Sequence, residues 1–126
     1  MKILLGILLV ITTIFNFQPV FSAGHVEEAR AVFSEMVTAA KASNLDKFKS
    51  HILPRDLAEM EKEGVTRMIM MMMVEDDPAV FQAEETEGYI LFTQEIKEEG
   101  PDSSMTMRRE VYMIKHEGHW KFGTPQ

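Results

Sequence analysis

The apolar residues in the first part of the chain follow the pattern of a helix with one buried side. From Val26 onward they recur at intervals of three and four residues, which places them on one face of an α-helix. The positions are Val26, Ala29, Val32, Phe33, Met36, Val37 and Ala40. This pattern predicts an amphipathic helix over residues 27 to about 42.

Three shorter helical segments are predicted next, over residues 45–52, 57–63 and 65–74. Pro54 ends the first segment, Asp56 offers an N-cap for the second, and Gly64 separates the second from the third. Most of the chain between residues 27 and 74 is therefore predicted to be helical.

The residue types change after Pro78. Runs of β-branched and aromatic residues follow, separated by turn formers such as Gly88 and Gly100-Pro101. These runs predict four antiparallel strands, over residues 79–86, 88–98, 104–116 and 119–123. Helices followed by a meander of strands indicate an α+β fold, in which N-terminal helices pack on a four-stranded antiparallel sheet.

The last two strands allow their register to be predicted. Two residues, Glu117-Gly118, separate the two apolar runs and suit a tight hairpin turn. With this turn, His116 lies opposite His119 and Met113 lies opposite Phe122.

This register assigns the side chains to two faces, because successive strand residues point to opposite sides. The face toward the helices should hold Val111, Met113, Trp120 and Phe122. The other face should hold Tyr112, Ile114 and His116. Because this second face is partly apolar, we predict a homodimer that covers it through the sheet.

The N-terminus has the layout of a secretory signal peptide. Lys2 precedes an apolar run that ends near Phe15, too short to cross a bilayer permanently, and small residues follow it. We expect a signal peptide over residues 1–22 with cleavage after Ser22, and a cut after Gly24 as the second choice. An uncleaved membrane anchor is the alternative. Residues 23–126 would form the mature domain.

The composition restricts the cellular compartment and the classes of partner that are expected. The chain has no cysteine, so it has neither a disulfide nor a lipidation site, and export without disulfides suits a bacterial periplasm or secretion. Cleavage after Ser22 removes only Lys2 among the charged residues, leaving 12 basic and 20 acidic residues and a formal charge of −8. Nucleic acid is not expected as a partner, because its phosphates require a basic surface.

Three parts of the chain together resemble the NTF2-like superfamily, in particular its secreted lumazine-binding-like group, DUF4878. They are the helix with Ala31-Val32-Phe33, the step from Ala42 to Phe48, and the closing Gly118-His119-Trp120-Lys121-Phe122. The resemblance implies a curved sheet folded over helices into a cone with an internal pocket. It does not choose a function, since that superfamily includes isomerases, dehydratases and non-catalytic binding modules.

The predicted pocket has a floor and a roof from different layers. Val111, Met113, Trp120 and Phe122 would form the floor. Phe33, Met36 and Met70 would form the roof. Because the sequence holds no catalytic or cofactor motif, we expect non-catalytic binding of a small apolar molecule or a protein partner, and no cofactor. A cone-fold isomerase or dehydratase is an alternative; it needs an ionisable group inside the pocket, for which Glu95 and Glu85 are the candidates.

Methionine and histidine suggest a second alternative, a copper-handling protein. Thioethers are soft ligands that select Cu(I). In the methionine-rich run, Met70 and Met73 would share one helix face, and Met68 and Met72 would share another. His116 and His119 would be cross-strand neighbours within reach of one ion. Filling of the core by flexible side chains is the simpler interpretation of the methionines.

Overall fold

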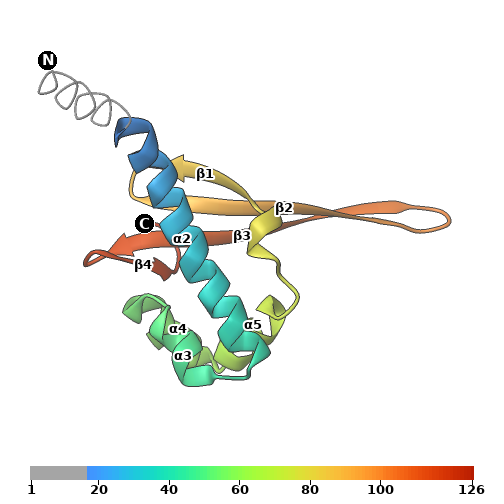
Figure 1. The fold of residues 1–126 in the computed structure, drawn as a ribbon. Helices are drawn as coiled ribbons and strands as arrows, with labels where there is room; N and C mark the ends of the chain where they lie inside the picture. Colours follow the sequence, from blue (N-terminus) through green and yellow to red (C-terminus); the bar gives the residue numbers. More distant parts are fainter. Residues whose placement is uncertain (1–16) are drawn as a thin grey trace, which may run out of the picture.

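The computed structural model describes residues 17–126 (Figure 1). Its first element, α2 (Phe17–Lys41), begins well before the expected residue 27. Pro19 does not prevent this earlier start, because it lies in the first turn of the helix, where proline is tolerated. Most of the predicted signal peptide lies outside the described residues, and α2 passes through the predicted cleavage position after Ser22. Among residues 17–126, no helix has both the length and the apolar character needed to span a membrane.

Three short helices follow: α3 (Leu45–Ser50), α4 (Pro54–Glu63) and α5 (Thr66–Met73). The side chain of Asn44 caps α3 by accepting a hydrogen bond from the Lys47 amide at 3.1 Å. The predicted cap at Asp56 is wrong, because α4 begins at Pro54, a residue suited to the first helical position. The Asp56 carboxylate instead accepts a hydrogen bond from the Thr124 hydroxyl at 2.9 Å.

The second half forms one antiparallel sheet in the order β1-β2-β3-β4. The strands are β1 (Gln82–Thr86), β2 (Tyr89–Glu99), β3 (Ser104–His116) and β4 (His119–Phe122). The first strand starts later than predicted, because the short 3-10 helix η1 (Pro78–Val80) occupies its expected beginning. The α+β prediction is confirmed.

The predicted register of the last hairpin is also confirmed. Met113 lies opposite Phe122 and His116 lies opposite His119. Glu117 and Gly118 have φ angles of 51° and 84°, as a two-residue turn between twisted strands requires. The hairpin therefore presents Trp120 and Phe122 on the face expected from the sequence.

Two apolar clusters hold the layers together. The sheet core lies between α2 and the inner face of the sheet. It contains Ala29, Phe33, Val37, Phe81, Ile90, Phe92, Val111, Met113 and Trp120. The helical core lies between α2 and the shorter helices. It contains Met36, Ala39, Ala40, Phe48, Ile52, Met60, Met70 and Met73. Phe122 packs against both clusters and so links β4 to the helices.

The outer face of the sheet has a smaller aromatic group. The rings of Tyr89 and Tyr112 meet edge to face, with centroids 5.6 Å apart, and Ile114 is half-buried beside them. The predicted assignment of Tyr112 and Ile114 to this face is confirmed by the register. The homodimer through this face stays a prediction.

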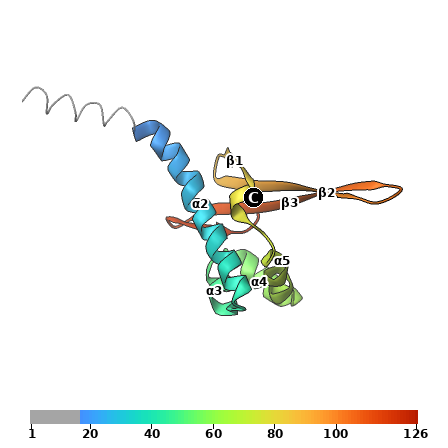
Figure 2. The ribbon, with the colours of Figure 1, turned by 45° about the vertical axis from the view of Figure 1, so that its right-hand side comes forward.

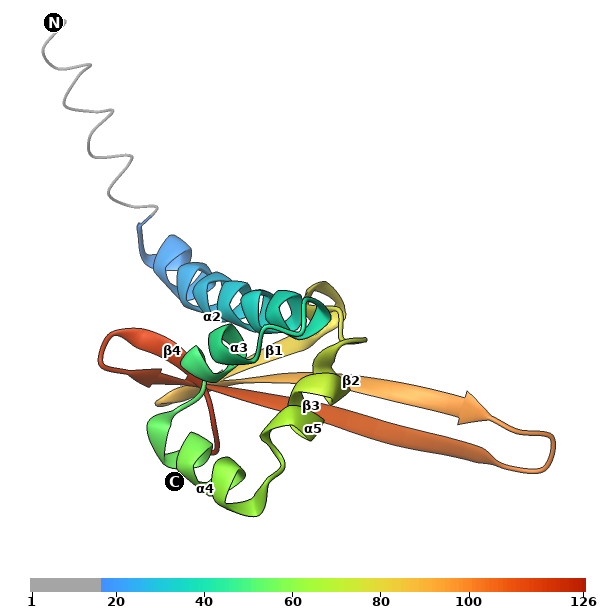
Figure 3. The same ribbon diagram turned by 90° about the horizontal axis from the view of Figure 1, so that it is seen from below.

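The long β2–β3 hairpin extends well beyond the rest of the sheet. β1 reaches only as far as Thr93, and β4 pairs only with residues 113–116. Residues 94–109 thus form a two-stranded ribbon, here called the arm. Figures 1, 2 and 3 agree in showing the arm projecting past the helices.

Candidate functional site

The predicted pocket residues form packed core. Phe33, Met36 and Met113 are completely buried, and Met70 and Val111 are almost so. Phe33 does lie against the predicted floor, since it shares the sheet core with Val111, Met113 and Trp120. Met36 and Met70 lie in the helical core instead. The set is therefore divided between two clusters, with Phe122 as the contact between them.

Only the edge of this set meets open space. Trp120 lines a shallow hollow of about 240 Å³ together with His25, Glu85 and Lys115. Val111 and Phe122 line a second hollow, of about 200 Å³. Both are smaller than the roughly 300–1,000 Å³ usual for a small-molecule site.

Glu95 is a catalytic candidate only if its side of the strand faces inward, and it does not. The inner face is defined by Ile90 and Phe92, which are buried in the sheet core, so residues of the opposite parity, including Glu95, point to the outer face. There the exposed Glu95 lies opposite Arg108. It lines a polar hollow of about 580 Å³ with Arg108, Gln82 and Glu84 among others.

Glu85 lies on the inner side of the sheet, but at its margin. Its partner across the strands is Ile90. Its carboxylate is exposed and lies 3.5 Å from His25 Nδ1. Glu85 is therefore placed beside an imidazole but outside the water-poor interior that acid–base chemistry favours.

The histidines are dispersed. His116 and His119 are direct cross-strand neighbours, and His116 Nε2 lies 3.8 Å from the Glu117 carboxylate. Among residues 17–126, no group of three or more His, Cys, Asp or Glu side chains is arranged to hold a metal ion. The predicted methionine candidates, Met70 and Met73, lie together but inside the helical core.

His51 is the histidine most affected by its surroundings. Its side chain is 15% exposed, and Nε2 lies 3.3 Å from the Glu35 carboxylate without the geometry of a hydrogen bond. Burial lowers the pKa of His51; Glu35 opposes this effect, while Lys121 and Lys47 reinforce it. Burial dominates, so the neutral imidazole is favoured at neutral pH.

The methionines of residues 24–126 fall into two equal groups. One group is buried in the cores: Met36, Met60, Met70, Met73 and Met113. The other is 47–65% exposed: Met68, Met71, Met72, Met105 and Met107. Among residues 24–126, Val80 is the only other large apolar residue with a similar exposed fraction. We call the second group the methionine surface.

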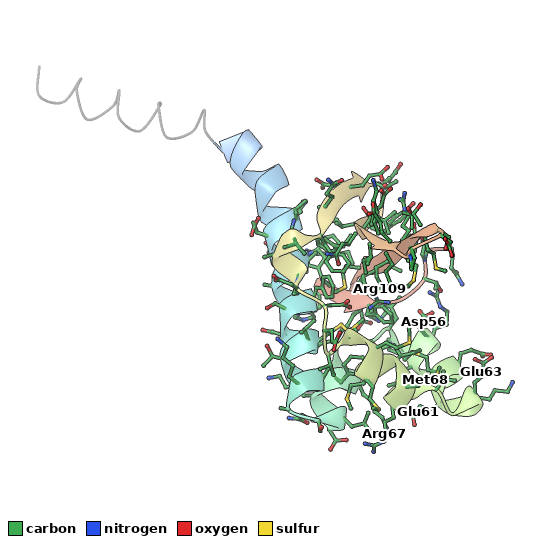
Figure 4. All side chains as sticks on the ribbon, turned by 90° about the vertical axis from the view of Figure 1, so that its right-hand side faces the viewer. Asp56, Glu61, Glu63, Arg67, Met68 and Arg109 are labelled. Atoms are coloured by element: carbon green, nitrogen blue, oxygen red, sulfur yellow. The ribbon has the colours of Figure 1, made fainter. Side chains whose placement is uncertain are left out.

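The methionine surface has one part on α5 and one part on the arm. On α5, Met68 lies one helical turn before Met71 and Met72. The opposite side of this helix enters the helical core. In Figure 4 Met68 lies on this helix, below Arg109 of β3. Met107 lies two residues from Arg109 along β3 and on the same face of the strand.

Arg109 connects the two parts. It forms an ion pair with Asp76, just beyond the end of α5, and its Nε donates to Asp76 Oδ1 at 3.3 Å. Arg109 also lines the 200 Å³ hollow with Met72 and Ile69. The base of the arm is thereby fixed beside the exposed side of α5. The spacing of Met68 and Met72 predicts that they share one helix face, but it does not distinguish this exposed face from the buried one.

Comparison with known proteins identifies no relative. No protein-family model, no curated protein and no solved structure matches the chain. The NTF2-like resemblance rests on the three sequence segments alone and stays a prediction.

Proposed function

We propose that this is an exported, non-catalytic binding module that contacts a protein partner through the methionine surface. The observation that carries the proposal is the exposure of five methionines on two neighbouring elements. Large apolar side chains gathered on a surface are typical of contact sites. Methionine is suited to such sites because its flexible, polarizable side chain adapts to varied shapes.

The packing of the interior favours a protein partner over a small apolar molecule. Phe33, Met36 and Met113 are completely buried between the layers. A ligand in the predicted pocket would therefore have to displace core side chains. The hollows at Trp120 and Phe122 are open and small. A protein segment needs no such cavity, because it can lie along α5 and the arm.

The position of Glu95 supports binding without catalysis. A general acid or base works best where water is excluded and its pKa is shifted, and Glu95 is exposed on the outer face opposite Arg108. Export is supported by the apolar N-terminal run after Lys2 and by the lack of cysteine.

Site-specific photo-crosslinking in cells that export the full chain tests the proposal. A photoreactive phenylalanine analogue is placed at Met71 or at Met107, and the control position is Lys41, exposed at the end of α2. We expect a defined protein adduct from both methionine positions and none from Lys41. Equal labelling at all three positions, or no adduct at any, would refute the proposal.

A second candidate function, binding of a soft metal ion, is favoured by one observation. Met68, Met71 and Met72 form a triangle of exposed thioethers on one turn of α5, and three such ligands can converge on Cu(I) or Ag(I). Met71 and Met72 lie in the last turn of the helix, where the macrodipole attracts cations. The exposed Glu75 lies two residues beyond the end of α5.

Native mass spectrometry with Ag(I) tests this second function. The triple variant Met68→Leu, Met71→Leu, Met72→Leu should lose a bound ion that the original chain retains. The buried pair Met70→Leu, Met73→Leu is the matched control and should retain it. No bound Ag(I) in the original chain, or full retention in the triple variant, would exclude the site.

A further inference from the structure

Cleavage after Ser22 would make Ala23 the first residue of the mature chain, followed by Gly24 and His25. These residues offer four nitrogen atoms in order: the terminal amine, the amides of Gly24 and His25, and the His25 imidazole. Only two or three chain atoms separate each nitrogen from the next, so all four can close around one ion in small chelate rings. A planar set of nitrogen ligands is typical of Cu(II) and Ni(II) sites.

The structure leaves these residues free to take up that arrangement. The His25 side chain is 51% exposed, and its contact with the exposed Glu85 carboxylate at 3.5 Å contributes little in water. A Cβ atom at Gly24 would meet no atom within 4 Å. Val26, the next residue after His25, packs against the sheet core. Residues 23–25 can therefore leave the helix while Val26 still holds α2 in place.

Cleavage also frees the backbone amides that the ion needs. In an α-helix each amide donates to the carbonyl four residues earlier. In the continuous helix that starts at Phe17, the amides of Gly24 and His25 therefore have Val20 and Phe21 as acceptors. Those two carbonyls leave with the signal peptide. In the mature chain both amides belong to the first turn, where a helix offers them no acceptor.

We propose that the mature N-terminus binds Cu(II) through the Ala23 amine, the amides of Gly24 and His25, and His25 Nδ1. The inference rests on the export that the proposed function includes and on cleavage after Ser22; it does not depend on the methionine surface. Binding releases one proton from the terminal ammonium and one from each amide, and no electron is transferred. Cu(II) is favoured over Ni(II) by the general order of metal affinities.

The position of the histidine makes the site specific to one mature chain. A cut after Gly24 would make His25 the first residue and leave only its amine and imidazole. In the uncleaved chain, residue 23 has no free amine. The site is thus created by export itself. It also differs from the thioether triangle on α5, because nitrogen donors in a plane take Cu(II) whereas thioethers select Cu(I).

The tryptophan reports on this site. The rings of His25 and Trp120 have centroids 6.4 Å apart, and both residues line the hollow of about 240 Å³. Bound Cu(II) quenches the fluorescence of an indole at such short range. Trp120 is the only tryptophan in the chain, so quenching that saturates at one ion per chain would place the metal at this end of α2.

Titration of the exported, purified chain with Cu(II) tests the proposal. The N-terminus is first identified from the intact mass, and excess glycine in the buffer keeps the ion off weak surface sites. We expect a chain that begins at Ala23, one Cu(II) per chain, saturable quenching of Trp120, and an electron paramagnetic resonance spectrum of four nitrogen ligands. A mature chain that begins at another residue, or one that binds no Cu(II) under these conditions, would overturn the proposal.

Two matched pairs of variants identify the donors. Gly24→Pro removes an amide proton and should raise the dissociation constant at least tenfold, whereas Gly24→Ala keeps the amide and should leave it within about threefold. His25→Gln should weaken binding as much as Gly24→Pro, whereas His119→Gln should not; His25→Gln decides the test if Gly24→Pro is not processed. Binding that survives His25→Gln, or that His119→Gln weakens equally, would overturn the proposal.

The two proposals fail in different ways. A chain that begins at Ala23 and yields photo-adducts from Met71 and Met107, but binds no Cu(II), would contradict only the copper site. A chain that binds Cu(II) and yields no adduct would contradict only the methionine surface. A chain that is not exported would contradict both.

Discussion

Gly123 lies close against the start of α4, and adding one methyl group there should destabilise the fold. A Cβ atom at this position would lie 2.5 Å from Leu53 Cδ1 and 2.6 Å from Asp56 Oδ2. Leu53 is buried, and Asp56 is held by Arg55 and Thr124. Neither neighbour can move away without losing contacts.

The expected cost of Gly123→Ala follows from these contacts. Overpacking of a well-packed site costs typically 1–3 kcal/mol, and the smaller entropy of the unfolded alanine chain offsets about 0.4–1 kcal/mol. Gly123 does not have a positive φ angle, so no backbone strain is added. We expect a net loss of about 1–2 kcal/mol, equivalent to a fall in Tm of roughly 5–15 °C for a domain of this size.

Thermal unfolding followed by circular dichroism measures this loss. Gly24→Ala is the matched control, because a Cβ there meets no atom within 4 Å, and it should not lower the Tm. An unchanged Tm for Gly123→Ala would show that the C-terminal segment does not lie against Leu53 and Asp56, and would refute the reasoning.

Two further predictions concern side chains packed among the helices. The pKa of His51 is lowered in the fold from its ordinary value of about 6.5, so the unfolded chain binds that proton more readily, and the free energy of unfolding should fall as the pH drops below about 6.5. His51→Gln should remove this part of the loss in urea titrations between about pH 7 and pH 5, while His119→Gln should keep it; identical profiles for the two variants would contradict the assignment. Met36→Ala, at a completely buried position, should lower the free energy of unfolding by about 2–5 kcal/mol in the same assay. A loss below 0.5 kcal/mol would instead be typical of a surface position.

The sequence predicted the elements that depend on local patterns. The turn at Glu117-Gly118 determines the register of the last hairpin, so the faces of Trp120 and Phe122 followed directly. The phase of the methionine run in α5 likewise predicted that Met68 and Met72 share one face and Met70 and Met73 another.

Features that depend on how the elements pack could not be predicted. Glu95 is a catalytic candidate only if the strand face that it shares with Leu91 and Thr93 points inward, but Leu91 is buried on the outer face. The inner face is set by Ile90 and Phe92 against α2. Six of the seven predicted pocket residues are buried and Phe122 is half-buried, yet apolar patterning alone cannot distinguish a packed core from the lining of a cavity. The free arm arises because β1 is shorter than β2 and β3.

Quantitative methionine oxidation in cells tests the central claim most directly. Cells that export the full chain, and the purified chain at high dilution, receive the same brief peroxide treatment, and sulfoxide is measured at each position by mass spectrometry. If the methionine surface is a contact site, oxidation should be several-fold lower in cells than in the diluted protein at Met68, Met71, Met72, Met105 and Met107. The buried methionines should be oxidised little in both samples. Equal oxidation of the exposed five in cells and at high dilution would contradict the claim that a protein covers them.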